Sequence, residues 1–289
     1  MDADKLIGRE FAGVTLLSVH GRGHSGVVFV GFQKSLKRKV AVKLVPKANL
    51  SARSFMDEAE VVAVLNHPNI VTVFDVGDDD EYLFITMQLV DGSSLQSMVE
   101  RSAKNPIPSK RRMPVTKVLR IIASVLGALE YAHRQGVVHQ DVKPGNILIE
   151  SQSYRPFLVD FGIARTELTE DESKYVHGTP LYMAPEQAKG DVTDGRADIY
   201  AAGVTMWEAL SGELPAPDLS AVKLVAMKAR SPEEFFKSTP SAGNPQIDAE
   251  LEHIILKATA AGRDSRYEDC GQFRDALSRY AERKFHERF

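Results

Sequence analysis

The sequence contains few of the features that mark disulfide-rich, nucleic-acid-binding or membrane proteins. Its 289 residues include one cysteine, Cys270, so an internal disulfide is excluded and the composition fits a reducing compartment. The net charge is −3, from 36 Lys and Arg against 39 Asp and Glu. Bulk nucleic-acid binders are strongly basic, so we expect no nucleic-acid partner.

Long apolar runs are also missing. No run reaches the roughly 18–20 residues that a transmembrane helix needs, and no signal-peptide core follows the acidic residues 1–5. We therefore expect a soluble, cytoplasmic protein without a membrane span. The apolar fraction of 43% is ordinary, and the length allows one large domain or two small lobes.

Residues 138–148, Val-His-Gln-Asp-Val-Lys-Pro-Gly-Asn-Ile-Leu, form the most informative stretch, and Asp-Phe-Gly follows at residues 160–162. Asp141, Lys143 and Asn146 share one short turn, and Asp160 lies on the next. Phosphoryl transfer from a nucleotide needs such a set, because one carboxylate orients the attacking hydroxyl while another carboxylate and an amide hold Mg²⁺. The pattern therefore indicates a phosphotransferase.

Residues 15–32 are typical of two strands joined by a glycine-rich turn with Gly21, Gly23 and Gly26. Glycines let a hairpin close on phosphates, because any side chain would hold the backbone away. The G-x-G-x-x-G pattern alone is weak, since an ordinary hairpin fits it equally well. Another β-rich segment follows where a dinucleotide fold would place a helix, which favours a nucleotide-covering loop.

Residues 39–45 alternate as a strand does, with Val40, Val42 and Leu44 on one face and Ala41 and Lys43 on the other. Ala41 is small enough to lie over an adenine, while Lys43 reaches the α- and β-phosphates. A strand lysine is more often a solvated edge residue. The preceding glycine loop is what favours the phosphate-binding interpretation.

These motifs, from about Phe11 to Ala281, resemble the catalytic domain of eukaryotic-type protein kinases. Lys143-Pro144 is similar to the serine/threonine branch, and the surrounding spelling is most like its bacterial members. The resemblance implies a single kinase domain of α+β class with the two-lobed kinase fold. The small β-rich N-lobe with one key helix would cover residues 1–87, the hinge 88–91 and the mainly helical C-lobe 92–289.

For the N-lobe, the resemblance implies that Glu58, in a helix expected at residues 54–65, pairs with Lys43. Glu60 is the rival, and the distance of Glu58 from the segment 66–70 favours Glu58. The implied ATP-binding set also includes Val28, after the glycine loop.

Residues 87–91 complete the nucleotide site implied by the resemblance. Met87 resembles the gatekeeper behind the adenine, and Gln88, Leu89 and Val90 resemble the hinge whose backbone groups bond the adenine edge. Asp91 has two equal interpretations, as a ribose ligand or as the cap of a helix starting near residue 93.

In the catalytic lobe, the resemblance makes Asp141 the base or hydroxyl orienter and Lys143 the residue that stabilises the γ-phosphate. Asn146 and Asp160 would bind Mg²⁺, or Mn²⁺ in its place, beside ATP. His139 is interpreted as structural, because packing and hydrogen bonding would hold the loop.

Gln140 departs from the family, which usually has Arg before the catalytic Asp. Gln supplies no charge to a phosphorylated activation segment, although Arg165 and Arg53 could partly replace the Arg. Thr166 and Thr169 are hydroxyls that autophosphorylation could modify. We expect activity to depend only weakly on phosphate in this segment.

Residues 178–186 resemble the substrate-docking stretch of the family. There the resemblance implies that Thr179 bonds the catalytic loop and that Glu186 forms a structural ion pair with Arg266. Asp198 would hold the backbone of the catalytic loop.

The predicted function is transfer of the ATP γ-phosphate to Ser or Thr hydroxyls of protein substrates. A pseudokinase, which only binds partners or nucleotide, is one alternative. It usually lacks a catalytic Lys, Asp or Asn, whereas Lys43, Asp141, Asn146 and Asp160 are all present in this sequence. A small-molecule phosphotransferase is the other, and it would lack the docking stretch. A homodimer is left open.

Overall fold

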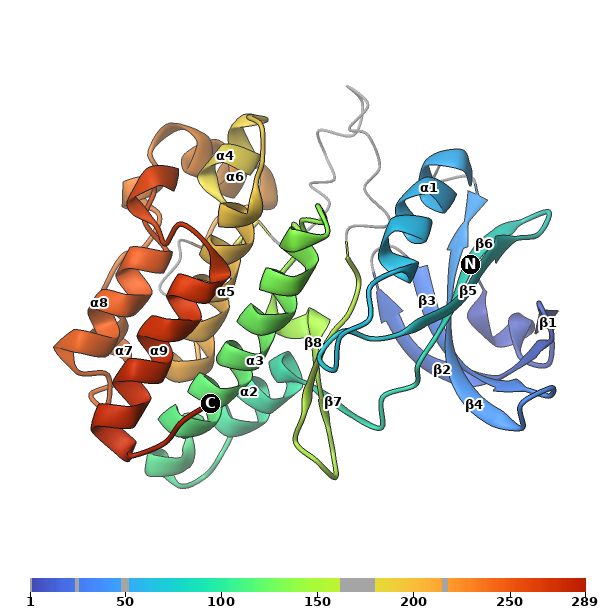
Figure 1. Ribbon diagram of the computed structural model, residues 1–289, viewed down its shortest axis with the longest axis horizontal. Helices are drawn as coiled ribbons and strands as arrows, with labels where there is room; N and C mark the ends of the chain where they lie inside the picture. Colours follow the sequence, from blue (N-terminus) through green and yellow to red (C-terminus); the bar gives the residue numbers. More distant parts are fainter. Residues whose placement is uncertain (1, 24–25, 48–51, 162–179, 215–217) are drawn as a thin grey trace. The chain divides into compact units, whose positions relative to one another are not determined.

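The computed structural model describes residues 2–23, 26–47, 52–161, 180–214 and 218–289 (Figure 1). These residues divide into two compact units, with the boundary after Asp91. Each unit has its own core, and each is described by itself.

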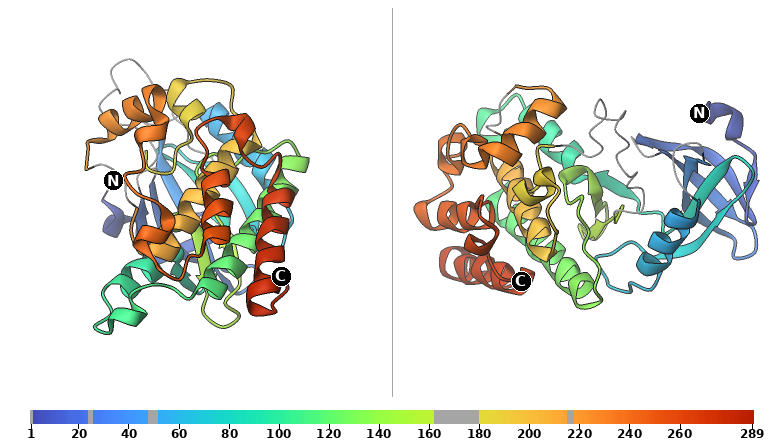
Figure 2. Two further views of the ribbon diagram at one scale, coloured as in Figure 1. Left: turned by 90° about the vertical axis from the view of Figure 1, so that its left-hand side faces the viewer. Right: turned by 90° about the horizontal axis from the view of Figure 1, so that it is seen from above.

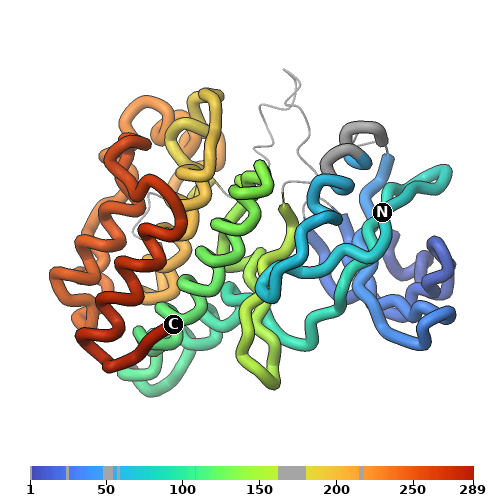
Figure 3. Tube along the Cα trace, viewed as in Figure 1, coloured from blue at the N-terminus to red at the C-terminus, as the bar shows by residue number. Residues whose placement is uncertain are grey.

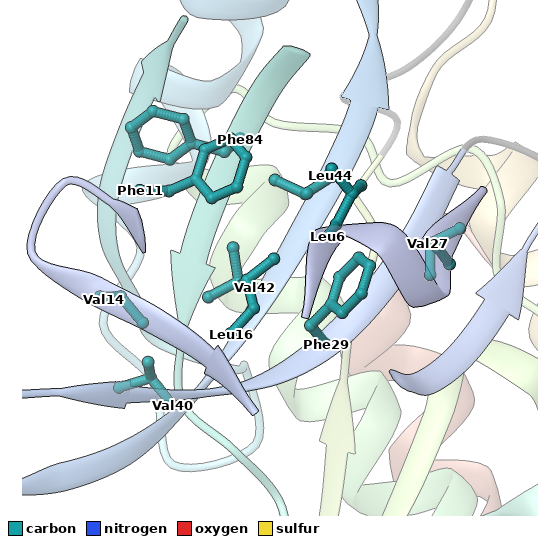
Figure 4. Packing of buried hydrophobic residues seen from close by; sticks show 11 residues of the cluster. Leu6, Phe11, Val14, Leu16, Val27, Phe29, Val40, Val42, Leu44 and Phe84 are labelled. Carbon is teal, nitrogen blue, oxygen red and sulfur yellow. The ribbon is translucent and has the colours of Figure 1, made fainter. Parts of the chain in front are cut away.

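The first unit contains an antiparallel sheet whose six described strands have the order β1-β2-β3-β4-β6-β5. One of its faces packs on a cluster that includes Leu16, Phe29, Val42 and Phe84, and Leu6 of the turn η1 (Ala3–Leu6) also joins it (Figure 4). The strands are β1 (Glu10–Phe11), β2 (Val14–Gly23), β3 (Gly26–Gln33), β4 (Arg38–Pro46), β5 (Val73–Asp78) and β6 (Tyr82–Met87).

The alternation of β4 sets the two faces of this sheet. Val40, Val42 and Leu44 all belong to the buried cluster, as predicted from their period of two. The alternation places Ala41 and Lys43 on the opposite face, and both are buried.

Helix α1 (Ala52–Ala63) belongs to the same unit and contacts β5 and β6 (Figure 1). Its buried residues Phe55, Ala59 and Val62 recur at helical spacing, as they do in a helix that packs on one face. The helix begins two residues before the predicted segment and also ends two residues earlier.

The second unit is mainly helical, and helix α5 lies at its centre. Figure 2 shows helices around α5, which contacts α2 (Leu95–Ala103), α3 (Val115–Arg134), α7 (Pro240–Gly243), α8 (Ala249–Ala258) and α9 (Cys270–Phe285). The remaining helices are α4 (Pro185–Lys189) and α6 (Ala221–Arg230), and the 3₁₀ turns are η3 (Pro108–Lys110), η4 (Pro144–Asn146), η6 (Pro232–Glu234) and η7 (Arg263–Ser265).

Helix α5 (Gly195–Ser211) is buried on every side from Ala197 onward. Where two helices approach closely, a small residue is needed at the contact, and this explains Gly203. A Cβ on Gly203 would lie 2.8 Å from the Ala258 Cβ of α8, so glycine permits this close packing.

A small antiparallel sheet completes the second unit, with β7 (Gly92–Ser94), β8 (Ile147–Glu150) and β9 (Pro156–Leu158) in that order. The end of the chain returns to α3, where Arg120 pairs with Glu287 at 3.0 Å (Figure 3). Within the described residues, no helix has the length and apolar character that crossing a membrane requires. The β-rich first unit and the helical second unit agree with the predicted two-lobed α+β fold.

Candidate active site

The loop before β8 is held in place by Asp198, a fully buried carboxylate in the first turn of α5. Its Oδ2 accepts the backbone N–H of His139 at 2.8 Å, and its Oδ1 accepts that of Gln140 at 2.7 Å. The His133 ring nitrogen Nε2 lies 2.7 Å from the same Oδ2. Asp198 therefore fixes the backbone of the catalytic loop.

Asp141, Lys143 and Asn146 converge within this loop. Lys143 Nζ donates to Asp141 Oδ2 at 2.7 Å, and Asn146 Nδ2 donates to the same oxygen at 2.9 Å. Asn146 Nδ2 also donates to the Asp141 carbonyl at 2.8 Å. Within the described part of the chain, Asp141 Oδ1 receives no hydrogen bond, so this oxygen remains as an acceptor on a carboxylate whose orientation is fixed.

The pairing of β8 with β9 brings the second carboxylate to the same loop. The Val159 N–H donates to the Asn146 carbonyl at 3.0 Å. Asp160 follows Val159 directly in the chain, so this bond ties the residue before Asp160 to Asn146. Gln140 and Asp160 have φ values of 64° and 58°. Left-handed backbone at non-glycine residues is strained and is concentrated at functional sites.

Asn146 and Asp160 fit a hard divalent cation. Because Asn146 Nδ2 is engaged by Asp141, the amide oxygen is the atom left to bind a metal. Among the described residues no group of three or more His, Cys, Asp or Glu could hold a metal. One carboxylate with one amide suits Mg²⁺, which keeps several water or phosphate ligands of its own.

His139 supports both turns from the core. Its Nε2–H donates to the Val159 carbonyl at 3.0 Å, while Nδ1 accepts the Asp141 N–H at 3.2 Å, so this network requires the neutral ring. The ring packs on Phe161 with a centroid distance of 4.4 Å. Burial lowers the pKa of His139, against the opposing effect of nearby carboxylates, and so favours the same neutral form.

In the first unit, the sheet register gathers the predicted nucleotide-binding side chains. Val28 of β3 lies opposite Lys43 of β4, and Ala41 lies opposite Met87 of β6. Lys43 is only 6% exposed. These four residues therefore occupy neighbouring positions on three adjacent strands.

The acidic partner expected for Lys43 comes from α1. The side chain of Glu58 lies outside the described residues, although its position is three residues after Phe55 and four before Val62, the spacing of one buried face. The rival Glu60 is exposed. The helix geometry thus favours Glu58 as the partner.

The three glycines of the loop differ in what the fold demands. A Cβ on Gly26 would lie 2.2 Å from the Leu44 carbonyl oxygen, and its φ is 151°, so strand packing alone requires glycine there. Among the described residues, a Cβ on Gly21 would meet nothing within 4 Å, and one on Gly23 only an oxygen at 3.6 Å. Packing explains Gly26, whereas Gly21 and Gly23 leave room for close approach of a ligand.

Just after β6, the Gln88 N–H donates to the Thr72 carbonyl at 2.9 Å, so this N–H is not the hinge group that would bond the adenine edge. Leu89 and Val90 follow, with Val90 buried. The capping interpretation of Asp91 is wrong. Ser94 is the N-cap of α2 and accepts the Ser97 N–H at 3.1 Å, while Asp91 is exposed.

Glu186, at the start of α4, forms a buried bidentate pair with Arg266, with N–O distances of 2.6 and 2.8 Å. Arg266 also donates to the carbonyls of Arg196, Ala260 and Ala261, so all five of its N–H donors are used. This pair anchors the end of the docking stretch to the helical core.

The structure adds docking-stretch contacts that the sequence analysis missed. Tyr182 O–H donates to Glu208 of α5, and Lys228 of α6 donates to the carbonyls of Leu181 and Met183. Lys228 lies four residues after buried Leu224, on the same helical face, and that spacing was the available signal. The predicted residues Arg165, Thr166, Thr169 and Thr179 lie outside the described part of the chain.

The comparisons with known proteins agree with this geometry. A family model described as protein kinase domain matches residues 15–274, and the chain belongs to that family. The class, bacterial-type serine/threonine kinase catalytic domains, and the predicted two-lobed fold are thereby confirmed.

Two curated relatives are named as serine/threonine-protein kinases. Pkn1 of Myxococcus xanthus is 35% identical over 286 residues, covering 95% of this chain and 39% of that protein. PrkC of Bacillus subtilis is 35% identical over 272 residues, covering 91% and 40%. The chain spans about two fifths of the length of these relatives.

Among solved structures, the kinase domain of Mycobacterium tuberculosis PknI is similar, with a TM-score of 0.75 and 32% identity. The match covers 95% of this chain and 98% of that domain. The similarity therefore extends over both units.

Two glycine substitutions test which glycine is required by strand packing and which leaves room for a ligand. Gly26→Ala should destabilise the protein by at least about 1–3 kcal/mol, because an L-residue is strained at this φ and its Cβ would clash with β4. Gly21→Ala is the matched control and should leave the melting temperature within about 1 °C of wild type, because nothing occupies its Cβ position. Thermal unfolding of both variants checks this, and equal losses of stability would contradict the assignment.

Acid should destabilise the protein through His139. The unfolded chain binds this proton near pH 6.5 but the folded chain only at lower pH, so between these values unfolding is favoured as pH falls. His139 should contribute up to about 1 kcal/mol of lost stability between about pH 6.5 and pH 5.5. Denaturant unfolding of His139→Gln should show a smaller pH slope, whereas His253→Gln, at an exposed histidine, should keep the wild-type slope.

Proposed function

We propose that the protein transfers the γ-phosphate of ATP to Ser or Thr hydroxyls of protein substrates. The observation that carries this proposal is the Asp141 carboxylate, whose Oδ2 is held by Lys143 and Asn146 while Oδ1 remains as an acceptor. A carboxylate so fixed orients a hydroxyl and accepts its proton as the phosphate moves. The named activity of the relatives Pkn1 and PrkC supports the same reaction.

Each residue then has one task. Lys143 lies beside Asp141 and stabilises the charge that builds on the transferred group. Asn146 and Asp160 hold Mg²⁺, which neutralises phosphate charge when bound. Lys43, paired with Glu58, binds the α- and β-phosphates under the glycine loop, and residues 88–91 serve as the hinge that receives the adenine.

The exposed Asp91 keeps the ribose-binding role within this proposal, because Ser94 takes the capping role. We also propose that the enzyme works in the cytoplasm in signalling by phosphorylation. Protein rather than small-molecule acceptors are favoured by the docking stretch, which Glu208 of α5, Lys228 of α6 and Arg266 hold in place.

Gln140 makes a regulatory consequence part of the proposal. Its N–H binds Asp198 and its carbonyl accepts Gln187 Nε2 at 3.2 Å, so the backbone at residue 140 is fixed by groups that do not depend on an Arg side chain. The charge that would bind a phosphorylated activation segment is absent from this position. Activity should therefore depend weakly on such phosphate.

Removing the negative charge of Asp141 tests the reaction. Purified protein incubated with Mg-ATP should gain phosphate on Ser or Thr, whereas Asp141→Asn should be slower by about 10²–10⁴-fold because it cannot accept the proton. Intact mass and phosphosite mapping provide the measurement, with ATP binding as the control for folding. Equal incorporation by both proteins would rule out this role for Asp141, and wild type that binds ATP without transfer would favour a pseudokinase.

The Gln140 hypothesis has its own test. Phosphatase-treated wild type should phosphorylate a protein acceptor within about tenfold of the untreated enzyme, because residue 140 offers no charge for a phosphate. Gln140→Arg supplies that charge and should become more dependent on phosphorylation. A hundredfold fall for dephosphorylated wild type would refute the hypothesis.

A further inference from the structure

The ammonium group of Lys228 is fully buried next to the docking stretch. Lys228 Nζ donates to the Leu181 carbonyl at 2.6 Å and to the Met183 carbonyl at 2.7 Å. The same atom lies over the ring of Phe235 at 4.0 Å and that of Tyr200 at 4.9 Å. Two carbonyls and two aromatic faces thus surround it.

This environment is energetically unfavourable for a charged lysine side chain. In the described part of the chain, no carboxylate forms an ion pair with Lys228. Burying an ammonium without a carboxylate partner costs several kcal/mol, which hydrogen bonds and aromatic faces offset only in part. Burial lowers its pKa well below the usual range, as does the nearby Arg266, while Glu186 acts in the opposite direction.

The two carbonyls that Lys228 binds are two residues apart, on either side of Tyr182. Residues 180–182 form a turn, and Lys228 binds the carbonyls on both sides of Tyr182, so one side chain holds the backbone here at two points. The Tyr182 side chain is held separately by Glu208 of α5. The side chains of Leu181 and Met183 are half-buried, and their positions depend on the backbone that Lys228 holds.

We propose that Lys228 is a positioning residue for the protein substrate: it holds the backbone of residues 181–183 in the form against which the acceptor segment binds. This inference rests on the proposed kinase function and adds a residue of α6 to it. Lys228 acts through the docking stretch and touches neither nucleotide nor acceptor.

The test compares Lys228→Met, which keeps the apolar stem but removes the donor, with Lys228→Gln, which restores two N–H donors on a shorter side chain. Lys223→Met is the matched control, because Lys223 is an exposed lysine of the same helix. The probes are a degenerate peptide library with one fixed Ser or Thr and the single peptide that wild type phosphorylates best.

We expect Lys228→Met to raise KM for the peptide at least tenfold and to flatten the preference around the acceptor, while KM for ATP changes less than twofold. Lys228→Gln should recover part of the peptide KM, and Lys223→Met should match wild type. Hydrogen–deuterium exchange of the amides at residues 181–184 should be at least tenfold faster in Lys228→Met than in Lys223→Met.

An unchanged peptide KM and exchange rate in Lys228→Met would overturn the proposal. So would a loss in which peptide KM, ATP KM, kcat and melting temperature all worsen together, because that pattern marks a structural role. If Lys228→Met does not fold, Lys228→Gln is compared with wild type by the same criteria. Wild type that phosphorylates no peptide would refute the proposed function, and the exchange rates would still show whether Lys228 holds the stretch.

Discussion

The buried carboxylate of Asp198 is the constraint on which the catalytic loop depends. A charge inside a protein must be compensated by hydrogen bonds, and Asp198 receives two backbone N–H groups from the loop in addition to its contact with His133. One of those N–H groups belongs to Gln140, whose backbone is in the left-handed region. The strained loop conformation and the solvation of Asp198 therefore support each other.

Within the same loop, some side chains hold the backbone in place and others carry the proposed reactive groups. His139 holds the loop through neutral ring bonds to Asp141 N–H and the Val159 carbonyl, so its protonation would remove an acceptor rather than add a catalyst. Lys143 and Asn146 share Asp141 Oδ2, and no group in the described part of the chain donates to the other carboxylate oxygen. The proposed chemistry needs a carboxylate whose direction does not change. Lys143 and Asn146 hold the Asp141 carboxylate, and His139 holds the Asp141 backbone N–H.

Local patterns predicted much of this architecture. The alternation of Val40, Val42 and Leu44 and the stripe of α1 were readable because burial on one face imposes a period. The sequence left the cap of α2 open, since Asp91 and Ser94 are both residue types that cap helices and only the backbone geometry decides between them. Lys228 was missed because its acceptors are carbonyls 45 and 47 residues away, and carbonyls leave no mark in a sequence.

Two buried cations, Arg266 and Lys228, share the ring of Tyr200, each 4.9 Å from its centroid. They are compensated differently. Arg266 has a bidentate carboxylate and three carbonyls, which together accept from all five of its N–H donors. Among the described residues, Lys228 contacts two carbonyls and two ring faces. The first arrangement locks Glu186 at the start of α4. The second ties the Leu181 and Met183 carbonyls to one side chain of α6, while the Tyr182 side chain between them is held by Glu208 of α5.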